Sequence, residues 1–221
     1  KVSASFITLG GVWVSMVVPD KDGIPGDVVL GYDDLDSYRK NPPHFGAPVG
    51  RNANRIKGAV LTIGGKDYPL AANDGPNNLH SGPDLYHDRV WECSASETDK
   101  GSRLDFYLES PDGDQGYPGN AKITVSYTLT DEDSLVLSVQ DISRGIDQET
   151  LEKLQQQLGT AAHPDRRDSG YGLYNVNERI HILFGSSYGL TVTSEPDFGT
   201  EVTVKIPKLK GDDIFVPGNA L

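Results

Sequence analysis

The chain has 221 residues, a length that suits one large all-β domain or two small domains. Hydrophobic residues make up 36% of it and charged residues 24%, and no apolar run is long enough to span a bilayer, so the composition predicts a soluble globular protein and excludes a membrane partner. The 32 acidic and 20 basic residues give a net charge of −12 with no basic tract, which excludes a nucleic-acid partner.

Up to about residue 139 the sequence is typical of strands separated by turns, because glycine and proline punctuate short apolar or alternating runs. Strands are expected at 12–18, 27–30, 59–63, 67–70, 90–94, 103–109, 121–130 and 134–140. The last two are predicted to form a hairpin, because they flank the polar turn 131–133. The spacing of these strands favours an antiparallel β-sandwich.

After about residue 140 the apolar period changes from alternating to helical. Apolar residues at 146, 151, 154 and 158 predict a helix that ends at Gly159, and a second helix is expected over 173–184. Strands are expected at 190–194 and 200–206. The predicted fold class is therefore α+β: a sandwich-like unit over 1–139, a two-layer α/β segment over 140–209, and a tail over 210–221.

Cys93 is the single cysteine of the sequence. One cysteine can form neither an intrachain disulfide framework nor a cysteine-based zinc site, so no metal is expected. A chain without disulfides suits a reducing compartment, and the sequence predicts a cytoplasmic protein.

Two polar clusters, at 50–56 and 77–82, lie on glycine-rich turns of the first part. Arg55 can donate to several oxygens in one plane, Asn54 can donate and accept, and His80 offers a donor or proton-transfer group near neutral pH. A hydroxylated ligand such as a sugar would satisfy all three together. The alternative is structural: Arg55 and Asn54 hold a loop in place, and His80 caps a turn.

Five segments carry a family resemblance: 27–33, 41–43, 50–56, 77–82 and 110–120. In order and spacing they resemble the aldose 1-epimerase (galactose mutarotase) family, from the N-terminus to about residue 139. The resemblance implies a β-sandwich that interconverts the α and β anomers of a sugar without a cofactor. In that reaction the ring oxygen is protonated and the anomeric hydroxyl deprotonated, and the ring opens and closes on its other face.

Carried over motif by motif, the resemblance makes Arg55 the sugar-binding arginine, Asn54 its neighbour in the pocket, and His80 the first active-site histidine, with a small-molecule sugar as partner. Trp91 is expected to pack in the core rather than stack on the sugar. The other histidines of this part, His44 and His87, are expected at the surface or in loops.

The chain departs from this family in its second half. The family's second histidine, its acidic sugar ligand and its glutamate general base have no matching motifs here. General acid–base catalysis needs both partners on the substrate, so anomer interconversion is expected to be impaired even if a sugar binds.

The second part resembles another family, on segments 141–146, 170–180, 184–185, 188–190 and 194–200. These resemble the C-terminal portion of the ATP-binding domain of sensor histidine kinases. Asp141 would accept a hydrogen bond from the adenine amino group, and Gly170 and Gly172 would leave a helix N-terminus open to phosphates. The resemblance places Gly145 and Thr200 in the same nucleotide site. Without it, the glycines are explained as helix caps and turns.

This part also departs from its family. The earlier helix, whose asparagine would hold Mg²⁺, has no counterpart, since the residues before Asp141 are predicted to form a sheet. ATP with Mg²⁺ is therefore an alternative partner that is expected to bind poorly. Three functions remain open: an anomer-converting enzyme, a sugar- or nucleotide-binding module, and a structural chimera, joined near 135–140, that does neither.

Overall fold

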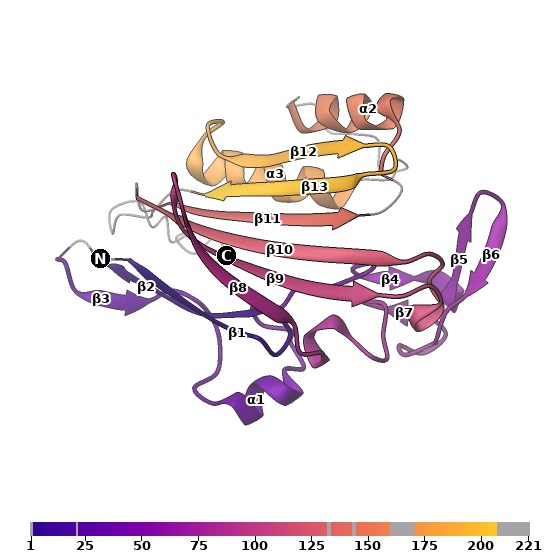
Figure 1. The fold of residues 1–221 in the computed structure, drawn as a ribbon, viewed down its shortest axis with the longest axis horizontal. Coiled ribbons are helices and arrows are strands. Elements are labelled where there is room, and N and C mark those ends of the chain that lie inside the picture. Colours follow the sequence, from indigo (N-terminus) through magenta and orange to yellow (C-terminus); the bar gives the residue numbers. More distant parts are fainter. Residues whose placement is uncertain (1, 21, 132–133, 143–144, 160–170, 207–221) are drawn as a thin grey trace, which may run out of the picture.

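The chain folds as a β-rich protein with few helices, as predicted from the sequence (Figure 1). A computed structural model describes residues 2–20, 22–131, 134–142, 145–159 and 171–206. Within these residues, no helix has the length and apolar character needed to cross a membrane. The predicted tail over 210–221 lies outside the described residues.

Among the described residues, the β structure consists of two larger antiparallel sheets and two short strand pairs. The first sheet contains β1 (Ser3–Ile7), β2 (Val12–Pro19) and β3 (Pro25–Asp27). The six-stranded sheet, in the order β12-β13-β11-β10-β9-β8, contains β8 (Glu92–Thr98), β9 (Gly101–Ser110), β10 (Ala121–Thr130), β11 (Leu135–Ile142), β12 (Gly189–Glu195) and β13 (Gly199–Ile206). The short pairs join β4 (Arg55–Ile56) to β7 (Asn78–Leu79) and β5 (Val60–Ile63) to β6 (Lys66–Pro69).

The described residues also contain three α-helices. The helix α1 (Leu35–Lys40) follows the first sheet, and its N-cap Asp34 accepts a hydrogen bond from the Ser37 backbone N–H. The helices α2 (Gln148–Gly159) and α3 (Tyr171–Phe184) come after β11, and both contact β12. Helices were predicted over both of these last segments, because their apolar residues recur at helical spacing.

The register of the six-stranded sheet places one apolar row across five strands. Phe106, Val125, Val139, Val202 and Val192 are aligned partners on β9, β10, β11, β13 and β12. Since side chains alternate between the faces of a strand, these residues share one face of the sheet. The sheet therefore has a single apolar face that runs from the first part of the chain into the second.

Two different elements cover this face. At the β9 and β10 end, Phe6, Trp13 and Met16 of the first sheet pack against it in one core cluster. At the β12 end, Leu151 and Leu158 of α2 pack against it in another. The two parts of the chain thus share one sheet but have separate cores.

The structure differs from the predicted strands at the start of the chain. β1 was not predicted, and the strand expected at 27–30 is wrong, since β3 ends at Asp27. The Asp27 carboxylate accepts hydrogen bonds from the backbone N–H groups of Met16 and Val29, both 3.0 Å away. These bonds turn the chain away from the sheet at this point.

A partly buried ion pair closes the loop between β9 and β10. Both guanidinium ends of Arg89 donate to the Asp114 carboxylate, at 2.8 and 2.9 Å. The Arg89 hydrogen bonds lower the pKa of Asp114 to about 2, below the ordinary value of 3.8. Because the folded pKa is depressed, the pair stabilises the fold at neutral pH and is lost as the pH falls from about 4 towards 2.

Shortening Leu151 to alanine tests whether the shared sheet couples the two cores. We expect Leu151→Ala to lower the free energy of unfolding by about 2–5 kcal/mol, because a buried leucine is lost from the α2 core. Both tryptophans, Trp13 and Trp91, lie in the first part. Their fluorescence should nevertheless follow the lower midpoint and coincide with the circular dichroism transition. An unchanged tryptophan transition would show that the two parts unfold independently.

The acid sensitivity of the Arg89–Asp114 pair is measurable with Asp114→Asn. Between pH 5 and pH 2 the unchanged chain should lose about 2 kcal/mol more of its unfolding free energy than the variant, which has no carboxylate to protonate. Denaturant titrations at both pH values give this difference. Parallel losses in the two proteins would mean that the pair contributes nothing to stability. Asp36→Asn is the control, because Asp36 forms an exposed pair with Arg39.

Candidate functional site

The pairing of β4 with β7 brings the predicted sugar-binding residues together. Arg55 lies opposite Leu79, so Asn54 and His80 are neighbours at the end of the ladder. The Asn54 backbone N–H donates to His80 Nδ1 at 3.0 Å, and the His80 backbone N–H donates to the Asn54 carbonyl at 3.0 Å. Two motifs 26 residues apart thus form one cluster.

The bond from Asn54 determines the tautomer of His80. Since Nδ1 accepts a hydrogen bond, the proton of the neutral ring is on Nε2. Burial, with smaller contributions from His44 and Arg55, lowers the pKa of His80 below 6.5. At pH 7 His80 is therefore neutral and offers Nε2–H as a hydrogen-bond donor.

Arg55 lies beside the His80 ring, and the Asp74 carboxylate orients its side chain. Its Nε donates to the Asp74 carboxylate at 2.6 Å, and the Arg55 side chain remains 54% exposed. An exposed pair of this kind contributes at most about 1 kcal/mol to stability. The guanidinium is oriented by Asp74 but remains open to a ligand.

Three residues of the cluster have a left-handed backbone conformation, which residues with a side chain rarely adopt. Asn54, His80 and Ser81 have φ values of +66°, +53° and +60°. Residues other than glycine adopt this left-handed region rarely, and such positions gather at functional sites. The local turn geometry therefore supports a binding role, although it also matches the structural alternative in which His80 shapes a turn.

A buried hydrogen-bond network holds this turn. Ser81 Oγ accepts from the Asn52 backbone N–H at 2.7 Å and is 3.0 Å from Tyr117 Oη. Tyr117 Oη in turn donates to the fully buried Asn78, whose amide binds the carbonyls of Ala71 and Gly82. The network links both sugar motifs to the 110–120 loop, the last segment of the family resemblance.

Two further histidines adjoin His80, and the sequence did not reveal them. The ring of His44 lies 5.1 Å from that of His80 and 4.6 Å from that of His87. His87 was expected at the surface or in a loop; it lies in a short 3₁₀ turn of the connection between β7 and β8, but it is not at the surface, because it is only 5% exposed. Neither His44 nor His87 belongs to a sequence motif that predicts this long-range contact. Among the residues that the structure describes, no three His, Cys, Asp or Glu side chains gather as a metal site.

The residues predicted for a nucleotide include Asp141 and Thr200 of the six-stranded sheet, and Asp141 lines the same cleft as Asn52 and Tyr117. Asp141 and Thr200 are paired on β11 and β13, and the Thr200 backbone N–H donates to Asp141 Oδ1 at 2.7 Å. Gly145 follows with a φ of +70°, and a Cβ there would lie 2.3 Å from a β12 carbonyl oxygen. The Asp141 carboxylate thus binds the sheet itself. Gly172 lies in the first turn of α3, and Gly170 lies outside the described residues.

Two family models match the chain. The model described as "Aldose 1-epimerase" matches residues 1–151, and the model described as "Histidine kinase-, DNA gyrase B-, and HSP90-like ATPase" matches residues 103–210. The matches overlap over β9, β10 and β11. Both resemblances seen in the sequence are therefore supported by an independent family match.

Curated relatives match over 129 residues of the chain. Galactose mutarotase from Bos taurus is 40% identical over 129 residues, which cover 58% of this chain and 36% of the relative. Aldose 1-epimerase from Escherichia coli (strain K12) is 35% identical over the same shares. The matched region spans little more than a third of the length of these relatives.

Solved structures of aldose epimerases are also similar to this chain. An aldose epimerase homologue from C. elegans has a TM-score of 0.58 and 35% identity, covering 64% of this chain and 42% of that one. The galactose 1-epimerase from Lactobacillus acidophilus has a TM-score of 0.58 and 27% identity, over 65% and 41%. With a family model that matches residues 1–151, the chain belongs to the aldose 1-epimerase family.

Proposed function

We propose that the chain binds an aldohexose at Asn54, Arg55 and His80, and that it interconverts the anomers poorly. The observation that supports this most strongly is the bond from the Asn54 N–H to His80 Nδ1, which leaves Nε2–H as the outward donor. A neutral imidazole donor beside an exposed guanidinium suits the hydroxyl and ring oxygens of a sugar.

The same cluster supplies the hydrogen-bond donor, which is one of the two groups that anomer interconversion needs. His80 can give a hydrogen bond to the ring oxygen, which helps the ring to open. Deprotonating the anomeric hydroxyl needs a base on the substrate as well, and the Asp74 carboxylate of the cluster is bonded to Arg55. The matched region covers 36% of the curated relatives, so the family's remaining groups have no counterpart in it.

Sugar binding should depend on His80 and Arg55 but not on a distant arginine. We expect Arg55→Ala or His80→Ala to weaken binding of D-galactose at least about tenfold, because each leaves sugar hydroxyls without a partner. Arg39→Ala is the matched control, since Arg39 is an exposed arginine on α1. Ligand-observed NMR titration gives the affinities. Equal affinities in all four proteins would place the sugar elsewhere.

Polarimetry of fresh α-D-galactose with these proteins then separates binding from catalysis. The unchanged chain should raise the rate of mutarotation only slightly above the spontaneous rate. A large acceleration that disappears in His80→Ala would contradict impaired catalysis and show that a base is present.

A second candidate function rests on the ATPase family match over 103–210. We propose the division into a sugar-site unit (1–139), an ATPase-like α/β segment (140–209) and a tail (210–221), joined as a chimera along β11. In the second segment Asp141 Oδ1 accepts a hydrogen bond from the Thr200 N–H, so this oxygen of the carboxylate is engaged by the sheet. The described residues directly before Asp141 form β11 rather than the helix that would bring an asparagine to Mg²⁺.

Nucleotide binding should accordingly be weak. A fluorescent ATP analogue with Mg²⁺ is expected to show no competable binding at micromolar concentrations, since carboxylates and a net negative charge disfavour a polyphosphate. Competable micromolar binding that is lost in Asp141→Ala but kept in Asp147→Ala would make the second segment the functional one. Asp147 is a suitable control because its carboxylate accepts hydrogen bonds from Thr150 on the first turn of α2.

A further inference from the structure

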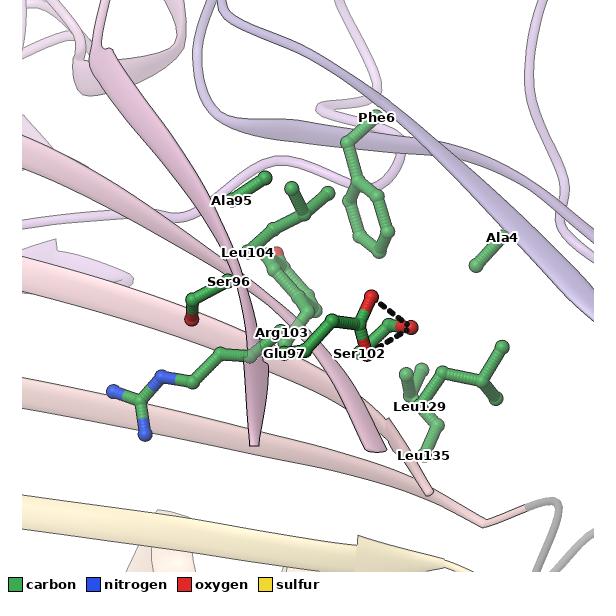
Figure 2. Close-up of a pocket in the computed structure, with 11 residues that line it drawn as sticks. Ala4, Phe6, Ala95, Ser96, Glu97, Ser102, Arg103, Leu104, Leu129 and Leu135 are labelled. Atoms are coloured by element: carbon green, nitrogen blue, oxygen red, sulfur yellow. Dashed lines mark hydrogen bonds between the residues drawn. The ribbon is translucent and has the colours of Figure 1, made fainter. Parts of the chain in front are cut away.

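The cavity in Figure 2 and the cluster around His80 differ in what surrounds them. The cavity has a volume of 340 Å³ and is lined mostly by apolar side chains, and Ser102 Oγ donates to the Glu97 carboxylate at 2.9 Å beside it. Such a lining is explained as a gap between packed apolar side chains. The cluster around His80 instead brings three imidazole rings together from three separate segments of the chain.

A turn after α1 presents one of these rings, that of His44. The side chain of Asn41, which is fully buried, accepts from the Phe45 backbone N–H at 2.9 Å and donates to the Phe45 carbonyl at 3.1 Å. The His44 backbone N–H donates to the Asn41 carbonyl at 2.8 Å. These three bonds fix the backbone on both sides of His44, so the turn determines where its side chain lies.

His44 is in contact with both of the other histidines. Its ring centre lies 4.6 Å from that of His87 and 5.1 Å from that of His80, and the planes of the His44 and His80 rings meet at 77°. His87 supports His44 from a buried position, and its Nε2 lies 3.4 Å from the Asp88 carboxylate. Edge-to-face ring pairs favour one arrangement over its alternatives by about threefold to tenfold. The His44 ring therefore restricts rotation of the His80 ring.

In the described part of the chain, one hydrogen bond orients the His80 ring. The Asn54 backbone N–H donates to Nδ1 at 3.0 Å. A half turn of the ring about its Cβ–Cγ bond would replace Nδ1 by a carbon that cannot accept a hydrogen bond, and would move Nε2–H away from its present direction. A single exposed hydrogen bond contributes little net stability. The orientation of Nε2–H therefore depends on a second contact as well.

We propose that His44 is a positioning residue for His80. Its ring holds the His80 ring in the orientation in which Nδ1 accepts from Asn54 and Nε2–H is the donor to a sugar. This inference rests on the proposed sugar site at Asn54, Arg55 and His80. The Nδ1 atom of His44 is itself buried and has no hydrogen-bond partner among the described residues, so it is closed off from a ligand, and His44 acts through the His80 ring.

Hydrogen exchange of two amides separates positioning from a general loosening of the turn. The Asn54 N–H donates to the His80 ring, whereas the His80 N–H donates to the Asn54 carbonyl. In His44→Ala the Asn54 amide should exchange about threefold to tenfold faster, because the ring is released, while the His80 amide keeps its rate. His80→Ala, which lacks the ring, gives the upper limit for the Asn54 amide.

His44→Phe is the conservative variant. It keeps a ring at this position and removes a buried nitrogen that has no partner in the described part of the chain, so it should fold and keep both exchange rates. His181→Ala, which changes a histidine on α3, is the matched control and should also leave both rates unchanged.

Galactose titration of the same proteins gives an independent readout. D-Galactose should bind His44→Ala at least about threefold more weakly than the unchanged chain, and should bind His44→Phe and His181→Ala equally well. Equal acceleration of both amides in His44→Ala, an unchanged Asn54 rate, or a His44→Phe variant that behaves like His44→Ala would overturn the proposal. A lack of galactose binding in every protein would overturn the sugar site, and the exchange rates would still support or overturn the positioning of His80.

Discussion

Strand β11 is hydrogen-bonded to β10 along one edge and to β13 along the other, and the rest of the molecule depends on this double pairing. Because alternate residues point to opposite faces, the register on both edges determines which side chains are buried. It aligns Val139 with Val125 on one side and Val202 on the other. A sheet that begins in the residues matched by the aldose 1-epimerase model therefore continues into β12 and β13, beyond residue 151, without a break in its apolar face.

Within the described residues, the two covers of this face form separate core clusters. The first sheet covers one end and α2 with α3 cover the other, while Val139 between them is 39% exposed. A cleft of 480 Å³ there is lined by Ile123, Val139 and Tyr117, among others. Tyr117 is also part of the network that holds the His80 turn. The sugar cluster thus lies next to the region where the covering of the sheet is incomplete.

Periodicity predicted the elements whose residues interact mainly with their neighbours in sequence. β10 has the predicted bounds, because its alternation is regular and a polar turn follows it. The sequence also singled out Asn54, Arg55 and His80, which the structure brings together; that they bind a sugar stays a prediction. Features that rest on distant contacts were missed: the two-residue strands β4 and β7, and the burial of His87 against His44. The end of β3 was predicted wrongly. The Asp27 carboxylate accepts backbone hydrogen bonds and ends the strand before the apolar run that follows it.

Hydrogen exchange of the β11 amides tests most directly whether the two parts form one sheet. If they do, the amides that donate to β13 exchange as slowly as those that donate to β10, since both require the same cooperative opening. Mass spectrometry or NMR of the exchanging chain gives the two sets of rates. Fast exchange confined to the amides that face β13, with slow exchange towards β10, would contradict a single continuous sheet.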